Sequence, residues 1–180
     1  GRPSPAVTLA AIAARTKRIR IGGAVAVLSW HNPLEIAQDY ATLDILSEGR
    51  LNFGVGRGGA KHEFDGYGVD WESSTERYLE ALEVVLKAWE GKPFSWDSKF
   101  FKFPELYVNP MPVQTPHPPL WQPTLTPASM AAVVPRNITP IVGASFSSKD
   151  RIKENFVHLN RILKEEDRPD MYRVAHPHIF

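Results

Sequence analysis

The sequence predicts an α/β fold in which parallel strands alternate with helices, and three observations carry this prediction. Strand-type and helix-type segments alternate along the chain, which is typical of βαβ units. The runs 19–27 and 51–55 are apolar along most of their length, as expected of strands covered by helices on both faces. Proline and capping residues stand at the starts of the helical segments. Together these patterns indicate one parallel sheet with helices around it.

The elements follow one another without an internal repeat or a low-complexity tract. Capping residues with a following proline or acid mark helix starts, for example Asn32-Pro33 with Glu35 and Ser73 with Glu76. The expected elements are helix 4–15, strand 19–27, helix 32–49, strand 51–55, helix 73–89, hairpin 94–103, proline-rich connector 104–119, strand 120–122, helix 126–134, strand 139–143, a long helix from 148 and strand 172–180. Five of the strands belong to the main sheet, so we expect a chain that starts and stops inside an alternating fold.

The composition is that of an ordinary globular protein. Of the 180 residues, 43% are hydrophobic and 23% are charged, and the length fits one domain. A net charge of +1 argues against a nucleic-acid partner, and the absence of cysteine removes disulfides, thiolate catalysis and cysteine metal sites. No apolar run approaches a membrane span, and the N-terminus lacks the apolar core of a signal peptide. We therefore expect a cytoplasmic protein that contacts no membrane.

A glycine-rich loop with one arginine follows the strand 51–55. It reads Gly54-Val55-Gly56-Arg57-Gly58-Gly59. Glycine lets the backbone approach a ligand closely or adopt a positive φ angle. Backbone N–H groups freed in this way form an anion-binding concavity, and a guanidinium beside them matches a phosphate. The loop therefore predicts a phosphate site, with an ordinary surface arginine as the alternative.

The same loop also has the glycine spacing of the dinucleotide fingerprint, Gly54-x-Gly56-x-x-Gly59. That fingerprint requires a helix to begin directly after the last glycine. Residues 60–68 contain two more glycines and show no apolar period of 3.6 residues, and the next clear helix starts near Ser73. We therefore favour a different phosphate site over the dinucleotide fold.

Several further stretches carry a family resemblance. They are Leu9 to Gly23, Asn32-Pro33 with Ala37, Leu43-Asp44, Ser47-x-Gly49-Arg50-Leu51, Gly54-Val55-Gly56-Arg57-Gly58, Glu63-Phe64-x-x-Tyr67-Gly68, Pro110-x-Pro112-x-Gln114-x-Pro116-x-Pro118-Pro119 and Thr126-Pro127. With these motifs the chain resembles the luciferase-like flavin monooxygenases, the family of bacterial luciferase, over nearly all of its 180 residues.

The resemblance implies a (β/α)₈ TIM-barrel type of fold that binds reduced FMN or a deazaflavin at the C-terminal face of the barrel. The five predicted strands correspond to about strands 3 to 7 of that barrel. We therefore expect residues 1–180 to form a single partial domain, an incomplete barrel that lacks N-terminal and C-terminal strands. The family's frequent catalytic histidine follows the second strand and has no counterpart here, so the catalytic residues are unknown.

The resemblance also implies cofactor-binding residues. Arg57 matches the arginine that binds the FMN phosphate, and Gly58 and Gly59 follow it in the same loop. Ala24-Val25 matches a small dipeptide that luciferase joins by a cis bond beneath the flavin ring, so we expect a cis peptide bond there. Thr124 matches a phosphate-binding hydroxyl after the fifth strand. Pro127 occupies another family contact position, where it cannot donate a hydrogen bond.

The activity implied is that of a flavin-dependent monooxygenase that uses reduced FMN and O₂ on a small organic substrate, in which the cofactor supplies the chemistry. One alternative is a deazaflavin-dependent hydride-transfer oxidoreductase, and another is a non-catalytic flavin-binding or partner subunit. The family implies a flavin reductase as a possible partner that supplies reduced flavin, and a homo- or heterodimer.

Other candidate residues have simpler explanations. His176-x-His178 resembles the paired histidines of metallohydrolase barrels, but the further ligands of such a site are not in the sequence, so we predict no metal site. His31 follows the strand 19–27 at the end where barrel active sites lie, with a capping or solvated role as the alternative. Trp30 and Tyr67 are candidates for a wall against the flavin or substrate, or for packing of the excursion after the glycine loop.

Overall fold

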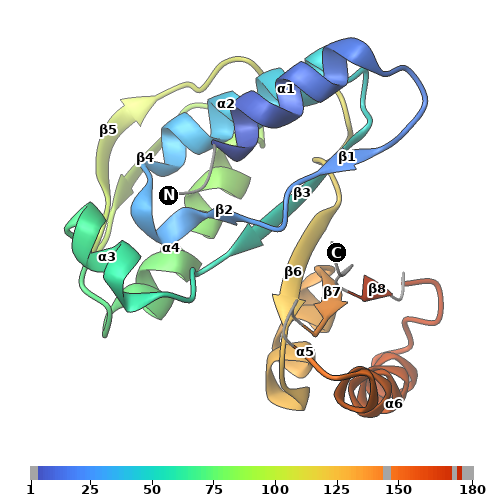
Figure 1. The fold of residues 1–180 in the computed structure, drawn as a ribbon. Coiled ribbons are helices and arrows are strands. Elements are labelled where there is room, and N and C mark those ends of the chain that lie inside the picture. The colour runs from blue at the N-terminus through green and yellow to red at the C-terminus, as the bar shows by residue number, and fades with distance from the viewer. Residues whose placement is uncertain (1–3, 144–146, 172–173, 176–180) are drawn as a thin grey trace. The chain divides into compact units, whose positions relative to one another are not determined.

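The computed structural model describes residues 4–143, 147–171 and 174–175, and the chain divides into two compact units, Gly1–Pro118 and Pro119–Phe180. Each unit is described by itself (Figure 1). The elements of the first unit are α1 (Pro5–Arg15), β1 (Ile21–Gly22), β2 (Ala26–Val27), the 3₁₀ helix η1 (Leu28–Trp30), α2 (Pro33–Leu46), β3 (Leu51–Gly56), α3 (Lys61–Tyr67), α4 (Ser74–Ala88), β4 (Phe94–Asp97) and β5 (Lys102–Leu106).

Three parallel strands form the sheet of the first unit. β1 pairs with the start of β3, with Ile21 opposite Leu51, and β2 pairs with its end, with Ala26 opposite Val55. The strand expected over 19–27 is therefore broken, because residues 23–25 leave the ladder between β1 and β2. The break lies opposite the middle of β3, where residue 23 comes so close to Gly54 that β3 has no room for a side chain there.

Helices α1 and α2 contact the strands of this sheet, and α4 packs against α2 and η1. α1 and α2 lie side by side (Figure 1), and Asn32 caps α2 by accepting a hydrogen bond from Leu34 N at 2.9 Å. The ring of Tyr40 on α2 lies 4.4 Å from that of Phe53 on β3, and Phe53 meets Trp89 at the end of α4 edge-on at 5.3 Å. The predicted helix starts at residues 4 and 32 and the strand expected over 51–55 are confirmed, whereas the strand expected over 19–27 is present only as the two short pieces β1 and β2.

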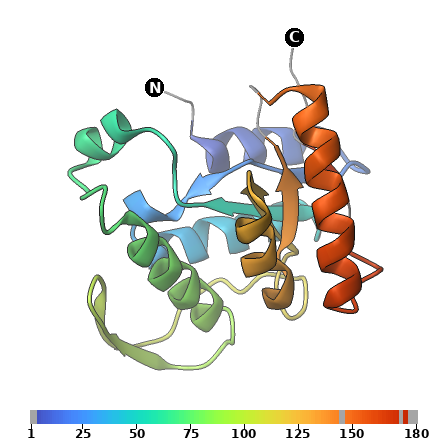
Figure 2. The same ribbon diagram turned by 90° about the horizontal axis from the view of Figure 1, so that it is seen from below.

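The hairpin expected over 94–103 is also present, as the antiparallel pair β4 and β5 that follows α4 (Figure 2). Glu80 on α4 holds it. The buried Glu80 carboxylate accepts hydrogen bonds from Trp96 Nε1 at 3.2 Å and Phe101 N at 3.0 Å, and also from Phe100 N. These bonds attach the hairpin to the helix rather than to the main sheet.

Two local predictions for the segment after β3 are wrong. A short helix, α3, begins at Lys61 directly after the glycine loop, where we expected no helix. The buried side chain of Phe64 anchors this helix, and Gly68, at φ +66°, ends it. The capping box expected at Ser73 and Glu76 does not form. Ser73 is itself helical at φ −84°, and its N–H donates to Asp70 Oδ2 at 2.8 Å.

The second unit repeats the strand–helix alternation. Its elements are β6 (Leu120–Thr124), α5 (Pro127–Val133), the 3₁₀ helix η2 (Val134–Arg136), β7 (Thr139–Val142), α6 (Lys149–Glu165) and β8 (Val174–Ala175). β7 pairs in parallel with β6 on one side and β8 on the other, and α6 runs along β7 (Figure 2). A buried cluster joins the helices to the strands and comprises Met130, Val134, Val142, Leu159, Ile162, Leu163 and Met171.

The predicted caps of the second unit are confirmed. Thr126 and Ser129 form a reciprocal capping box at the start of α5, and the Ser148 side chain accepts from Arg151 N at 3.2 Å at the start of α6. Of the strand expected over 172–180, the described part is β8, and His176 and His178 lie outside the described residues. Among the described helices, none is both long and apolar enough to cross a membrane.

Candidate functional site

The end of β3 lies in close contact with the segment between β1 and β2. A Cβ atom on Gly54 would lie 1.8 Å from the Gly23 carbonyl oxygen, and one on Gly56 would lie 2.7 Å from Val25 Cγ2. Glycine is therefore required at Gly54, where a side chain would displace the Gly23 backbone, and a side chain at Gly56 would displace the Val25 side chain. The Ala24–Val25 peptide bond is cis, as the resemblance implied. The structure thus brings Ala24 and Val25 to the strand end from which the glycine loop leaves.

The two glycines after Arg57 differ in what constrains them. Gly58 has φ +94°, and a Cβ atom there would lie 2.9 Å from Val27 Cγ1 and 3.1 Å from a ring carbon of both Phe64 and Trp30. Gly59 is exposed, and no atom lies within 4 Å of its Cβ position. The loop therefore turns tightly against packed side chains at Gly58 and opens into free space at Gly59.

Arg57 is half-buried and is held at two points. Its Nη1 donates a hydrogen bond to Ser74 Oγ at 3.1 Å, and its Cζ lies 4.4 Å from the centre of the Trp71 ring. Within residues 4–143, 147–171 and 174–175, the guanidinium makes no other hydrogen bond. A guanidinium that is held in place and keeps free N–H groups can bind a phosphate oxygen.

The backbone under Arg57 is fixed by a buried serine. Ser29 Oγ lies 2.9 Å from Arg57 O and 3.1 Å from Ser74 O, and Ser29 O accepts from Arg77 Nε at 2.9 Å. Ser29 comes from η1 and Ser74 begins α4, so three segments meet at one hydroxyl. Sequence reasoning missed Ser29, Trp71 and Ser74, because no spacing rule links residues 17 and 45 positions apart.

Aromatic rings pack α3 against η1 beside the loop. Trp30 stacks on Tyr67 at 4.8 Å and meets Phe64 edge-on at 5.3 Å, and the His31 ring lies 6.0 Å from that of Tyr67. Tyr67 keeps 57% of its surface exposed, so one face of this pair is open to solvent. Packing of the excursion therefore explains Trp30 and Tyr67 within the described residues.

Asp70 adds a negative charge in the segment between α3 and α4. Hydrogen bonds from the Ser73 side chain and backbone lower the pKa of this carboxyl, and the charge of Lys61 lowers it further. Asp70 therefore remains a carboxylate where the chain turns toward Trp71.

Thr124 belongs to the second unit, at the end of β6. Its side chain is buried, its Oγ1 lies 3.5 Å from Ile141 O on β7, and its carbonyl accepts from Gly143 N at 3.2 Å. Pro127 is the first residue of α5 and Thr126 caps that helix. Arg57, Gly58, Gly59, Ala24 and Val25 are thus gathered at one end of β3 in the first unit, and Thr124 stays a separate prediction.

Comparison with known proteins agrees with this arrangement. The luciferase-like monooxygenase family matches residues 1–180. The oxygenase component of a flavin-dependent trigonelline monooxygenase from Acinetobacter baylyi is 28% identical, with 98% of this chain and 50% of the relative covered. An F420-dependent glucose-6-phosphate dehydrogenase from Nocardia farcinica is 36% identical over 99 residues, which cover 52% of this chain and 30% of the relative.

Solved structures show the same fold. The monooxygenase RslO1 from Streptomyces bottropensis superposes with a TM-score of 0.85 at 27% identity, covering 97% of this chain and 53% of its own. The oxygenating constituent of 3,6-diketocamphane monooxygenase from Pseudomonas putida, in complex with FMN, gives 0.78 at 23% identity, with 91% and 48% covered.

The chain spans about half the length of the curated relatives it matches. Its α/β fold with parallel strands corresponds to part of the TIM barrel of these proteins, which confirms the expected incomplete barrel. The relatives include proteins named for dependence on flavin and on F420. The chain belongs to the luciferase-like monooxygenase family of oxidoreductases.

Proposed function

We propose that this chain is the cofactor-binding part of a flavin-dependent monooxygenase that uses reduced FMN and O₂ on a small organic substrate. The observation that carries the proposal is the Arg57 guanidinium, which Ser74 and Trp71 hold in place and which keeps free N–H groups, on a loop that continues through the exposed Gly59. This arrangement suits the phosphate of FMN, because that phosphate needs a positive charge and free N–H donors at close range. Family membership supplies the class of cofactor.

When bound, FMN supplies the redox chemistry with O₂, and the protein contributes binding and orientation. Arg57 would hold the phosphate through its free N–H groups, with Gly58 and Gly59 contributing backbone N–H groups. Ala24 and Val25, in contact with the end of β3, would lie against the ring system. Thr124, whose buried side chain belongs to the second unit, stays a separate prediction for a phosphate contact. The exposed or half-buried state of Ala24, Val25 and Gly59 supports such contact.

A matched pair of flavins tests this proposal, because FMN and riboflavin differ in the phosphate alone. We expect Arg57→Ala to weaken FMN binding by roughly tenfold or more and riboflavin binding little, since a charge-assisted hydrogen bond contributes about 1.5–3 kcal/mol. Fluorescence titration of both flavins gives the two dissociation constants. Arg18→Ala, which removes an exposed arginine far along the sequence, is the control. Equal losses for both flavins would remove Arg57 from the phosphate site.

A deazaflavin-dependent hydride transfer is the second candidate, and the 36% identity to the F420-dependent relative favours considering it. Titrating the protein with FMN and with a deazaflavin under the same conditions separates the two. Tighter binding of the deazaflavin, with no substrate-independent oxygen consumption by the reduced protein, would support the second candidate.

The name of the Acinetobacter relative, an oxygenase component, supports a further proposal about partners. We propose that reduced flavin reaches this protein from a separate flavin reductase. NADH oxidation, followed by the loss of NADH absorbance, should then not occur when this protein is the only protein present with NADH and FMN, and should begin when an NADH-dependent flavin reductase is added. NADH oxidation by this protein with FMN alone would contradict a separate reductase. A homo- or heterodimer stays a prediction, which light scattering would test.

A further inference from the structure

We propose that Ser74 and Trp71 are positioning residues, which fix the Arg57 guanidinium in the orientation that distinguishes a phosphorylated ligand from its unphosphorylated form. This inference rests on the proposed FMN site, because it assigns a role to residues behind the arginine rather than to groups that touch the ligand.

The Ser74 hydroxyl donates its one proton to Trp71 O and is therefore an acceptor toward Arg57. Ser74 is fully buried, and its Oγ donates to Trp71 O and accepts from Arg57 Nη1 at 3.1 Å. A hydroxyl has one proton and two lone pairs, so toward the guanidinium it acts only as an acceptor. One corner of the guanidinium is thereby tied to a fixed atom at the start of α4.

Trp71 covers one face of the same guanidinium. The Arg57 Cζ lies 4.4 Å from the centre of the Trp71 ring, which in turn meets the Phe64 ring edge-on at 5.0 Å and 89°. The planar group therefore cannot rotate freely about its long axis, since one face is covered and one N–H is bonded. Its other N–H groups have no hydrogen-bond partner in the part of the chain that the structure describes.

The backbone of the arginine is fixed with its side chain. Ser29 Oγ lies 2.9 Å from Arg57 O and 3.1 Å from Ser74 O, and Ser29 is fully buried. The main chain that carries Arg57 and the main chain that carries its acceptor are thus held at one point. Both ends of the Arg57–Ser74 hydrogen bond are therefore fixed before a ligand arrives.

A cation ordered in advance binds more tightly, because less side-chain freedom is lost on binding. Removing the Ser74 acceptor should therefore weaken FMN binding by about two- to tenfold, which corresponds to ordering one flexible side chain. Riboflavin binding should not change, because riboflavin has no phosphate for Arg57 to contact.

The experiment measures FMN and riboflavin dissociation constants for wild type, Ser74→Ala, Arg57→Ala and the double variant. We expect Ser74→Ala to lower the ratio of FMN to riboflavin affinity by about two- to tenfold, less than Arg57→Ala does. In the Arg57→Ala background, Ser74→Ala should leave the ratio unchanged. Ser73→Ala is the matched control, since the neighbouring Ser73 hydroxyl contacts Asp70 O at 3.5 Å and not Arg57.

Each other outcome is decisive. An unchanged ratio in Arg57→Ala would overturn the proposed FMN site, and this inference with it. A lowered ratio in Arg57→Ala with an unchanged ratio in Ser74→Ala would overturn the positioning role alone. So would an equal loss of both flavins, or a further fall of the ratio in the double variant. Should Ser74→Ala not fold, as circular dichroism would show, Trp71→Leu carries the same expectations.

Discussion

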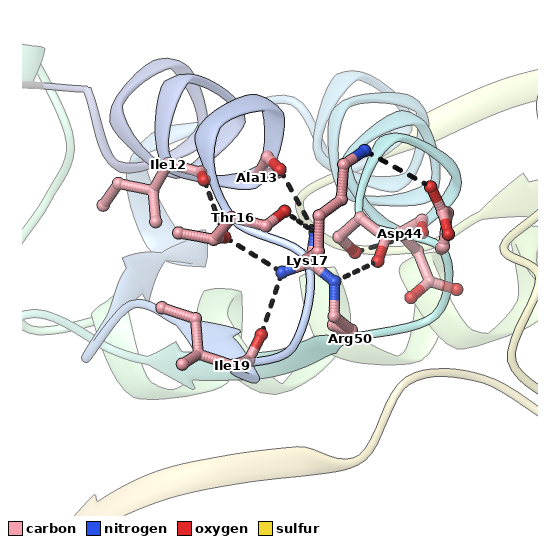
Figure 3. A network of polar contacts seen from close by, with 9 residues as sticks. Ile12, Ala13, Thr16, Lys17, Ile19, Asp44 and Arg50 are labelled. Carbon is pink, nitrogen blue, oxygen red and sulfur yellow. Dashed lines mark hydrogen bonds and ion pairs between the residues drawn. The ribbon is translucent and has the colours of Figure 1, made fainter.

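The two ends of strand β3 each carry an arginine, and the two side chains are used in opposite ways. Arg50, before the strand, donates five hydrogen bonds, to Ser47 O, Ile19 O, Ala13 O, and both the hydroxyl and the carbonyl oxygen of Thr16 (Figure 3). Arg57, after the strand, donates one, to Ser74 Oγ. The guanidinium groups at the two ends of this six-residue strand therefore donate five hydrogen bonds and one hydrogen bond, respectively.

The difference follows from what surrounds each end. At Arg50 the end of α1 presents the carbonyl oxygens of Ala13 and Thr16, and the guanidinium fork donates to both of them. At Arg57 the chain offers one hydroxyl and one aromatic face, and the remaining donors stay free. In barrel folds the end before the strands serves stability and the end after them binds ligands. The many hydrogen bonds of Arg50 match the stabilising end, and the free donors of Arg57 match the end at which we propose ligand binding.

The largest effect is expected from Arg50→Ala. The change leaves the helix-end carbonyls without their donor, so we expect a loss of about 3–5 kcal/mol in the free energy of unfolding. Urea denaturation followed by circular dichroism measures it. Arg50→Lys should recover less than half of the loss, because an ammonium group has three donors at one point and cannot replace the five hydrogen bonds of the guanidinium. A loss below about 1 kcal/mol would contradict the structural role of this end.

A second large effect at the same end is expected from Asp44→Ala. The buried carboxylate accepts from Val113 N at 2.9 Å, Gln114 N at 3.0 Å and Gln114 Nε2 at 2.7 Å. It thus ties the proline-rich connector to α2. Removing it leaves Val113 N and Gln114 N without this acceptor, so we expect a loss of about 2–4 kcal/mol in the free energy of unfolding.

Asp39 on the same helix provides the control for Asp44. Asp39 is largely exposed. Its pKa is raised, chiefly because its carboxyl loses part of its hydration in the fold, and then because of the neighbouring charge of Glu35. Asp39→Ala should therefore change the free energy of unfolding by less than about 0.5 kcal/mol. Similar losses at the two positions would show that helix charge, rather than the connector, accounts for the effect of Asp44.

The sequence predicted these two ends unequally well. The glycines and Arg57 form a pattern typical of phosphate-binding loops, and this pattern can be read from the sequence because its six residues, 54–59, are adjacent. Asp44 and Arg50 stand within the family motif, but their partners lie up to 70 positions away, and only the folded chain brings them together. Local patterns therefore predicted the glycine loop and Arg57 as a candidate phosphate site, whereas the polar contacts that hold the fold required the tertiary structure.

The segment between Gly59 and Ser74 shows a second limit of sequence reasoning. α3 has too few apolar residues to produce a helical period, and tertiary packing of Phe64 on Trp30 and Trp71 stabilises it instead. The sequence pattern of a capping box is present at Ser73 and Glu76. In the structure, however, Asp70 rather than Glu76 accepts the hydrogen bond from Ser73 N. Short helices and competing caps depend on neighbours that periodicity does not contain.

A smaller effect on stability is expected at the other end of β3. Arg57→Ala removes one hydrogen bond and one cation–π contact, so we expect a loss of about 0.5–1.5 kcal/mol in the free energy of unfolding. The comparison with Arg50→Ala in the same urea series is the test. If the two variants lose the same stability, the contrast between a structural and a ligand-binding arginine is wrong.

The smallest effect concerns Asp70, near the start of α4, and it depends on pH. Hydrogen bonds from Ser73 lower the pKa of the Asp70 carboxyl in the folded state below its ordinary value of about 3.9. A lowered folded-state pKa means that the carboxylate stabilises the fold above that ordinary value and loses this contribution as the pH falls through the folded-state pKa. In Asp70→Asn the amide oxygen still accepts from Ser73 N, but this titration is absent.

The melting temperature of wild type should therefore exceed that of Asp70→Asn slightly at pH 7, and the difference should vanish as the solution is acidified below pH 4. Adding salt should change the difference little, because hydrogen bonds from Ser73 are the larger cause of the lowered pKa and the charge of Lys61 the smaller. Parallel curves from pH 7 to pH 3 would contradict the prediction, since they would mean that Asp70 binds its proton equally in the folded and unfolded chains.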